Sequence, residues 1–187
     1  MAVFAFLAQL SGPAFAQRSH LSSLLAYNSQ RTERLYYVRV QDVDAGRNEL
    51  IGRALQALHR QLPPDRIALL RYAPELGQVA ARVVIDATPF GPVGDDSLRL
   101  SFEFSVTAIP GTYRLTLEGF ELMSSGLSSA WLEALGIEEP TLEALLKAQN
   151  AAYDSNRAWV LCQIDSQLGK FAEDVEAAVV KPREGSS

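Results

Sequence analysis

The chain has 187 residues, of which 48% are hydrophobic and 21% are charged, and its formal net charge is -5 at pH 7. A chain of this length and composition suits one globular domain that buries a core without needing a metal ion or a disulfide framework. The negative charge and the lack of any Lys and Arg cluster in the sequence argue against nucleic acid as a partner, because such binding depends on cations placed against phosphates.

Residues 1–16 have the pattern of a secretory signal peptide. An apolar run and a Ser-Gly-Pro breaker precede the A-x-A pattern Ala14-Phe15-Ala16, which predicts cleavage after Ala16. No Lys or Arg precedes Arg18, so the positive start typical of such leaders is missing, and the alternative is a buried N-terminal strand or helix. We expect a periplasmic or secreted protein with a polar spacer at residues 17–33.

A strand is expected at residues 35–43, which are rich in β-branched and aromatic side chains. One of its faces carries Tyr36, Val38 and Val40. Asp44 then stands where a helix N-cap would lie. Apolar residues follow at helical spacing from Leu50 to Leu62, where the Pro63-Pro64 pair ends the stripe, so a helix is expected between the Asp44 cap and Leu62.

Two more strands are expected at residues 67–72 and 79–87, followed by a loop at residues 88–97. The loop contains the adjacent Asp95 and Asp96, which could hold a cation. On an extended chain these two side chains point apart, and the loop's glycines match neither a phosphate-binding nor a calcium-binding spacing. We interpret the segment as a solvated hairpin loop.

The clearest pattern lies at residues 98–122, where apolar and polar side chains alternate on both sides of a Pro110-Gly111 turn. If Ile109 faces Thr112, the apolar side chains up to the glycine lie on one face of this hairpin. The pairs across the strands are then Ala108 with Tyr113, Val106 with Leu115, and Phe104 with Leu117. The alternation changes parity at Gly119, which predicts a bulge there.

The rest of the chain is expected to be helical, after a serine-rich link at residues 124–129. A short helix at residues 131–135 is expected to end at Gly136, and a longer helical region covers residues 141–180 as one helix or two. Its apolar stripe consists of Leu161, Ile164, Leu168, Phe171, Val175 and Val179. Packing on the sheet explains this stripe better than a coiled-coil dimer, because the stripe is shorter than three heptads. Residues 181–187 are expected to form a disordered tail.

The order strand, helix, four strands, helix predicts an α+β fold. Its antiparallel sheet of about five strands would carry helices packed on one face. The sheet and first helix occupy residues 34–123, and the helical region at residues 124–180 packs against them. No apolar run after residue 16 approaches the roughly 20 residues that a membrane span needs.

The chain resembles a bacterial domain of unknown function that has a TATA-binding-protein-like (TBP-like) fold and occurs in small exported proteins. The resemblance covers about residues 34–122. It rests on the strand YYVRVQDVD, the helix NELIGRALQAL, the strand IDATPF and the hairpin SFEFSVTAIPGTYRLTLEGFEL. It implies the fold and export, and it brings no catalytic motif.

The hairpin face away from the core is expected to be polar. It carries Ser101, Glu103, Ser105, Thr107, Arg114, Thr116 and Glu118. Proteins that hold the minor groove on a saddle of strands use basic residues and aromatic wedges, so DNA binding is not expected here. The register places Glu103 opposite Glu118. Such a pair could share a proton or hold a cation; alternatively, both side chains are solvated and screened by Arg99 or Arg114.

Three classes of function remain. The first is a non-enzymatic exported domain that binds another envelope protein or a surface polymer. The second is a carrier of an apolar small molecule between sheet and helix, beside Phe102, Phe104, Trp131 and Trp159, although aromatic residues at core positions are more often plain core than a ligand cup. An enzyme has the least support, because the sequence contains no nucleophile elbow, HExxH, phosphate loop or Cys-His pair. No cofactor or metal is expected, and the sequence leaves the oligomeric state open.

Overall fold

The computed structural model describes residues 26–27, 35–88, 98–123, 132–133, 135–149 and 155–180. The predicted leader, the tail, the serine-rich link, Trp131 and residues 89–97 of the predicted loop lie outside the described residues. A six-stranded antiparallel sheet has the order β1-β2-β6-β5-β4-β3. The strands are β1 (Ala26–Tyr27), β2 (Leu35–Asp42), β3 (Ile67–Ala73), β4 (Gln78–Thr88), β5 (Leu98–Ile109) and β6 (Thr112–Met123).

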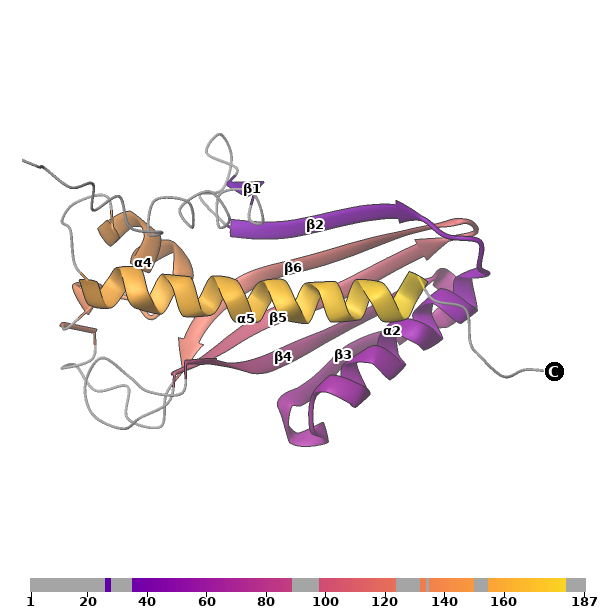
Figure 1. Cartoon of the computed structure of the whole chain (residues 1–187). Coiled ribbons are helices and arrows are strands. Elements are labelled where there is room, and N and C mark those ends of the chain that lie inside the picture. The colour runs from indigo at the N-terminus through magenta and orange to yellow at the C-terminus, as the bar shows by residue number, and fades with distance from the viewer. Residues whose placement is uncertain are drawn as a thin grey trace, which may run out of the picture.

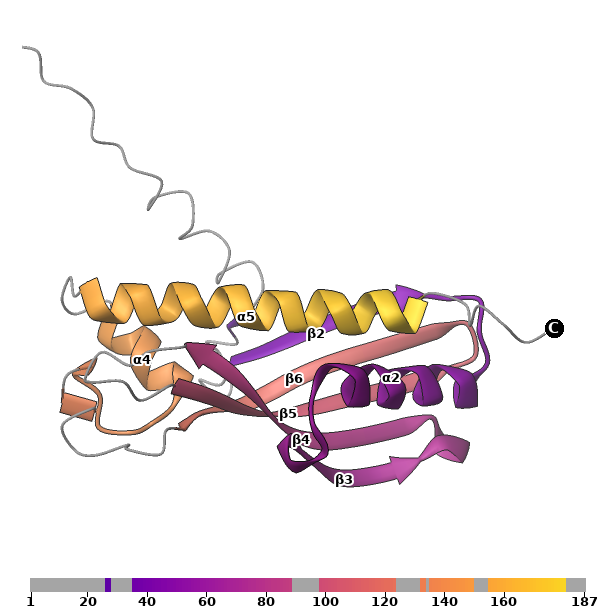
Figure 2. The same ribbon diagram turned by 60° about the horizontal axis from the view of Figure 1, so that its bottom comes forward.

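Two helices lie on the same face of this sheet (Figures 1 and 2). They are α2 (Arg47–Gln61) and α5 (Ser155–Val180), and the shorter α4 (Leu142–Gln149) lies at one end of the sheet. Two 3-10 turns, η1 (Pro64–Arg66) and η2 (Pro74–Leu76), flank β3. The predicted α+β architecture is therefore confirmed, with five long strands and the two-residue β1. That strand falls in the segment expected to be a spacer, where it was not anticipated.

The hairpin has the predicted register. Ile109 is paired with Thr112, and Phe104 is paired with Leu117. The pairing shifts between Ser101 and Glu103, opposite Gly119, whose φ of 65° is easy only for glycine. This bulge turns Phe120 and Leu122 back toward the core, where both are buried.

The core lies between the sheet and the two helices, and an aromatic cluster on β5 and α5 is part of it. Phe102 and Phe104 are fully buried, and the ring of Phe171 meets both of them edge-on, at centroid distances of 5.3 and 6.3 Å. Every residue of the predicted α5 stripe is buried. The stripe therefore packs on the sheet, as predicted, and the predicted helical region is divided into α4 and α5.

Helix α2 begins later than expected. Its N-cap is Gly46 rather than Asp44, and no side chain caps it. The reason is tertiary: the Val43 N–H donates to the Gly111 carbonyl at 2.9 Å, which ties the incoming chain to the β5–β6 turn. Because the backbone at Val43 is bound to this turn, the helix can begin only at a later residue.

Strand β2 faces the helices with its polar side chains. Tyr37 is paired with the buried Leu117 and Arg39 with the buried Leu115, so both lie on the helix-covered face. The residues predicted to share a face do so on the opposite side, where Val40 is 60% exposed. Alternation alone gave no reason to place the valines outward, because it does not say which face a helix will cover.

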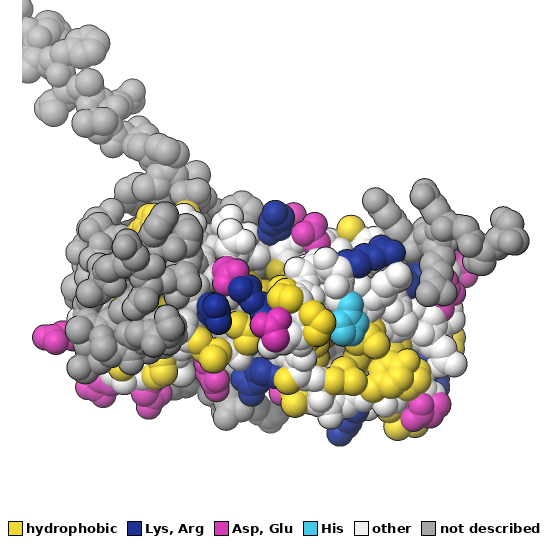
Figure 3. All heavy atoms as spheres, turned by 90° about the horizontal axis from the view of Figure 1, so that it is seen from below, with side chains coloured by type: hydrophobic (Ala, Val, Ile, Leu, Met, Phe, Trp, Pro, Cys, Tyr) yellow, Lys and Arg dark blue, Asp and Glu magenta, His cyan; other side chains and the backbone are white. Residues whose placement is uncertain are grey.

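Strand β3 is the last strand at one edge of the sheet, where no described residue pairs with its outer side. Figure 3 views the molecule from this side and shows hydrophobic side chains gathered on the surface. Gly77, at the turn into β4, has a φ of 68°, and a Cβ there would lie 2.0 Å from the carbonyl oxygen of Ala108. Only glycine therefore allows the turn after η2 to approach β5 so closely.

Candidate functional site

The face of the sheet opposite α2 and α5 is here called the open face. It consists of Val38 and Val40 of β2, Arg114, Thr116 and Glu118 of β6, Glu103, Ser105 and Thr107 of β5, Gln78, Ala80 and Arg82 of β4, and Leu70 and Arg71 of β3. Small polar and charged side chains dominate it. The prediction that this face is polar is therefore confirmed, except that Ser101 is buried. Its hydroxymethyl group lies between the larger side chains of its cross-strand neighbours Val84 and Glu121.

A shallow hollow of about 340 Å³ lies on the open face. It is lined by Leu70, Arg71, Gln78, Ala80, Glu103, Ser105 and Thr107. Ala80 and Ser105 are cross-strand partners with the smallest side chains of this set, so they form its floor. Larger side chains on β3, β4 and β5 form its walls.

A bulge in β3 shapes one wall of the hollow. The pairing with β4 shifts between Leu69 and Arg71, so Leu70 is the extra residue. Leu70 and Arg71 therefore both line the hollow. The Arg71 guanidinium donates to the side-chain oxygen of Gln78 at 3.0 Å, which orients both side chains at the rim.

The predicted carboxylate pair is in the expected register, since Glu103 lies directly opposite Glu118. Glu103 is half-buried in the hollow, and Glu118 is exposed outside it. On its other side Glu103 is paired with Arg82 of β4, a residue that sequence reasoning missed. Arg82 also lies 3.7 Å from a carboxylate oxygen of Glu121. Arg82 therefore neighbours Glu103 and Glu121, while Glu118 lies on the far side of Glu103.

The cations proposed to screen this pair lie elsewhere. Arg99 is paired with Asp86, and its Nε lies 3.6 Å from that carboxylate. Arg114 is paired with Thr107. The β4–β5 register was needed to find Arg82 as a neighbour of Glu103. The only signal for it in the sequence is the alternation of apolar residues in β4, which places Arg82 on the outer face.

The predicted apolar cup is only partly assembled. Phe102 and Phe104 meet Phe171 inside the core. Trp159 on α5 is 40% exposed, and no ring contact among the described residues joins it to them. A second hollow of about 310 Å³ opens beside Phe171, between the end of α2, β4 and α5. Its apolar lining includes Leu62 and Ile85, and its charged lining consists of Arg66, Asp86, Lys170 and Asp174.

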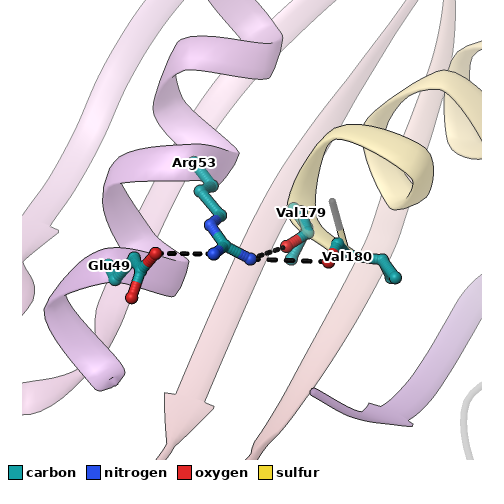
Figure 4. Close-up of polar contacts among 4 residues, drawn as sticks. All are labelled: Glu49, Arg53, Val179 and Val180. Carbon is teal, nitrogen blue, oxygen red and sulfur yellow. Dashed lines mark hydrogen bonds and ion pairs between the residues drawn. The ribbon is translucent and has the colours of Figure 1, made fainter. Parts of the chain in front are cut away.

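Arg53 joins the two helices (Figure 4). Its buried guanidinium donates to the Val179 carbonyl at 2.9 Å and to the Glu49 carboxylate at 2.5 Å. The C-terminal carbonyls of a helix lack intrahelical donors and carry partial negative charge, so a cation there is favourable. Arg53 therefore caps the end of α5 from α2, which is a structural role.

A second polar group joins α5 to β2. The Tyr37 hydroxyl donates to the Glu176 carboxylate, and Arg39 lies 3.7 Å from the same carboxylate. Burial raises the pKa of Tyr37 well above its usual value, and the bond to Glu176 adds to the effect. Burial and the Glu176 charge likewise raise the pKa of Tyr113 to about 12. Both phenols stay protonated at neutral pH and offer no general base. Tyr37 holds α5 through Glu176, whereas the Tyr113 hydroxyl donates to the side-chain oxygen of Gln41 on β2 at 3.3 Å.

Three further features of the described chain bear on chemistry. No group of three or more His, Cys, Asp or Glu side chains is arranged to hold a metal ion among the described residues. Within the same residues, no helix is long and apolar enough to cross a membrane. Cys162 is a free thiol that is half-buried on α5.

Comparison with known proteins identifies the fold. A crystal structure of a DUF4468 family protein from Bacteroides ovatus matches with a TM-score of 0.57 at 12% identity, covering 88% of this chain and 98% of that one. A TBP-like protein from Parabacteroides distasonis matches with a TM-score of 0.53 at 10% identity, covering 78% and 92%. No protein-family model and no curated protein matches the sequence. At these identities the likeness concerns the fold alone, and the TBP-like fold implied by the resemblance is confirmed.

Proposed function

We propose that this chain is a non-enzymatic binding module of the cell envelope or the secreted space, and that it binds an envelope protein or a surface polymer on its open face. The observation that carries the proposal is the hollow on that face. Both helices lie on the other side of the sheet, so the side chains around the hollow are not needed to fill the core. Residues that do not pack in the core are available to bind a partner.

The lining of the hollow suits a polar partner without strong net charge. Arg71 and Gln78 supply donors, Glu103 supplies an acceptor, and Ser105 and Thr107 supply both. One cation and one anion leave the site balanced, so a polyanion would gain little there. The hollow is shallow, which fits the surface of a large molecule better than a buried small one.

The binding site can be tested by filling the hollow. Ser105→Tyr places a ring over the floor, and Val40→Tyr places the same ring on the open face at the far strand β2. We expect wild type and Val40→Tyr to capture the same envelope component from native membranes, and Ser105→Tyr to lose it while unfolding at the wild-type temperature. Equal capture by all three proteins would show that the hollow is not the binding site.

Export is proposed on the pattern of residues 1–16. The test is to produce the chain in a bacterium, separate the cytoplasmic and envelope fractions, and determine the N-terminal residue by mass spectrometry. We expect Gln17 as the first residue of a protein outside the cytoplasm. An intact residue 1 on a cytoplasmic protein would contradict export.

A second candidate function is the carriage of an apolar small molecule, and the hollow beside Phe171 favours it. That hollow borders Leu62, Ile85 and the aromatic cluster, so an acyl or aromatic group could enter there with modest repacking. Native mass spectrometry of protein purified from its own envelope would then show added lipid-sized mass. A bare mass under gentle ionisation would exclude the carrier.

A further inference from the structure

The two edges of the sheet differ in whether a further strand pairs with them. At one edge, β1 pairs with β2 and gives the end of that strand a backbone partner. At the other edge, β3 pairs with β4 on one side and with no described residue on the other. An unpaired edge presents free N–H and C=O groups, and proteins usually protect such an edge with charges or prolines.

Strand β3 is apolar where protection would be expected. Leu69 is 50% exposed, Leu70 55% and Tyr72 52%, and Leu76 in the following turn is 63% exposed. Arg71 is the only charged residue within the strand. Figure 3 shows hydrophobic side chains on this side of the molecule. An exposed edge of this kind favours pairing with another strand.

We propose that β3 pairs antiparallel with the β3 of a second copy of this chain, which joins the two sheets into one. A two-fold axis perpendicular to the sheets keeps the helix-covered faces of both copies on the same side. Any allowed register must then place residues of the same face opposite each other. Strand β3 can therefore be tested for self-complementarity from its own pairing with β4.

The bulge at Leu70 selects one register. Leu69 and Tyr72 are paired with the buried Ala81 and Val79, so both side chains lie on the helix side of β3. An axis between Leu70 and Arg71 places Leu69 opposite Tyr72 of the second copy. An axis through Leu70 would instead place Leu69 opposite Arg71, which lies on the other face. The first register buries two leucine–tyrosine pairs, which is a favourable cross-strand combination.

The charges at the ends of β3 fit the same arrangement. Arg66 comes directly before the strand, and Glu75 follows it in η2. Antiparallel pairing in the proposed register brings Arg66 of each copy, which also binds Asp86 of its own chain at 2.6 Å, toward Glu75 of the other. A parallel arrangement would instead bring like charges together, so charge complementarity favours the two-fold dimer.

The interface is small. Half of the surface of a large side chain is on the order of 100 Å², so four such residues from each copy bury roughly 800 Å², and the edge backbone adds to this. Stable specific interfaces begin near about 1,200 Å². We therefore expect a dimer that dissociates on dilution. Leu70 and Arg71 line both the interface and the hollow, so dimerisation would place two hollows side by side. Any role of the paired hollows in binding rests on the proposed function, whereas the strand pairing itself does not.

Sedimentation of the full chain over a wide concentration range tests the pairing. Leu69→Lys puts a charge in the interface and leaves the lining of the hollow unchanged. Val40→Lys puts the same charge on β2, near the opposite edge of the sheet. We expect wild type and Val40→Lys to dimerise equally, and Leu69→Lys to dissociate at least about tenfold more readily. If Leu69→Lys loses the dimer but still captures the envelope component, dimerisation and binding in the hollow are independent of each other.

The register has its own test. The double variant Leu69→Cys with Tyr72→Cys should form disulfide-linked dimers on oxidation, and Leu69→Cys alone should not, because only the pair brings two thiols opposite each other. A wild-type chain that stays monomeric at every concentration would overturn the proposal. So would a dimer that Val40→Lys abolishes and Leu69→Lys does not, or protection of the β3 amides only when a different protein is added.

Discussion

Alternate residues of β5 have different roles, because one face of the strand packs in the core and the other lines the hollow. Phe102 and Phe104 point into the core and pack on α5, while Glu103 and Ser105 point to the open face and line the hollow. Burial makes the first pair necessary for stability, because each ring removes a large apolar surface from water. The second pair contributes little to folding, so its chemistry can vary with the partner.

The largest expected difference between the faces is in stability. Phe104→Ala should lower the free energy of unfolding by about 3–5 kcal/mol, because it leaves a cavity against Phe171. Ser105→Ala, one residue away on the open face, should change it by less than about 0.5 kcal/mol. Denaturant unfolding of both variants measures the contrast, and losses of similar size would mean that the open face is part of the packed structure.

The buried cation on the covered face comes next. Arg53→Met removes the donor to the Val179 carbonyl at the end of α5, which should cost about 1–3 kcal/mol. Arg60→Met, at an exposed position on the same helix, is the matched control and should be nearly neutral. Hydrogen exchange should rise at the C-terminal end of α5 in the first variant only. An unchanged helix end would show that Arg53 does not act as its cap.

Alkaline pH should weaken the covered face in a predictable direction. The pKa of Tyr113 is raised to about 12 in the folded chain and is near 10 when unfolded. Its contribution is therefore complete below pH 10 and is lost as pH rises from 10 toward 12, because the unfolded state ionises first. Tyr113→Phe should make the fall in unfolding free energy between pH 9.5 and 11.5 shallower than in wild type, as measured in urea. Parallel pH profiles would contradict this role for Tyr113.

Local patterns predicted the hairpin because its register depends on nearby residues. The turn at Pro110-Gly111 and the alternation on both sides of it leave one register with a common apolar face. The same reasoning placed Glu103, Ser105 and Thr107 on the open face. These are three of the residues that line the hollow.

The remainder of the hollow depends on pairing between strands that lie apart in the sequence. Leu70 and Arg71 reach the hollow only because of a bulge against β4, and no glycine or proline marks that bulge. The outward valines of β2 and the late start of α2 were also missed. Both depend on contacts with β6 and the β5–β6 turn, which a pattern within one segment does not contain.

The smallest expected effects concern the carboxylate row on the open face. Glu118→Gln removes a like charge opposite Glu103 and leaves Arg82 beside it, so it should stabilise the fold by about 0.5 kcal/mol. Glu103→Gln removes the same repulsion but also the carboxylate next to Arg82, so its net effect should be closer to zero.

A cation or a proton held between Glu103 and Glu118 would give the melting temperature of wild type a response that both variants lack. If the two carboxylates together hold Ca²⁺, adding Ca²⁺ should raise the melting temperature of wild type and of neither variant. If they share a proton, lowering the pH to 5 should shift wild type differently from both variants. Equal shifts in all three proteins would leave a screened pair beside Arg82, and Glu103 would then matter only as one wall of the hollow.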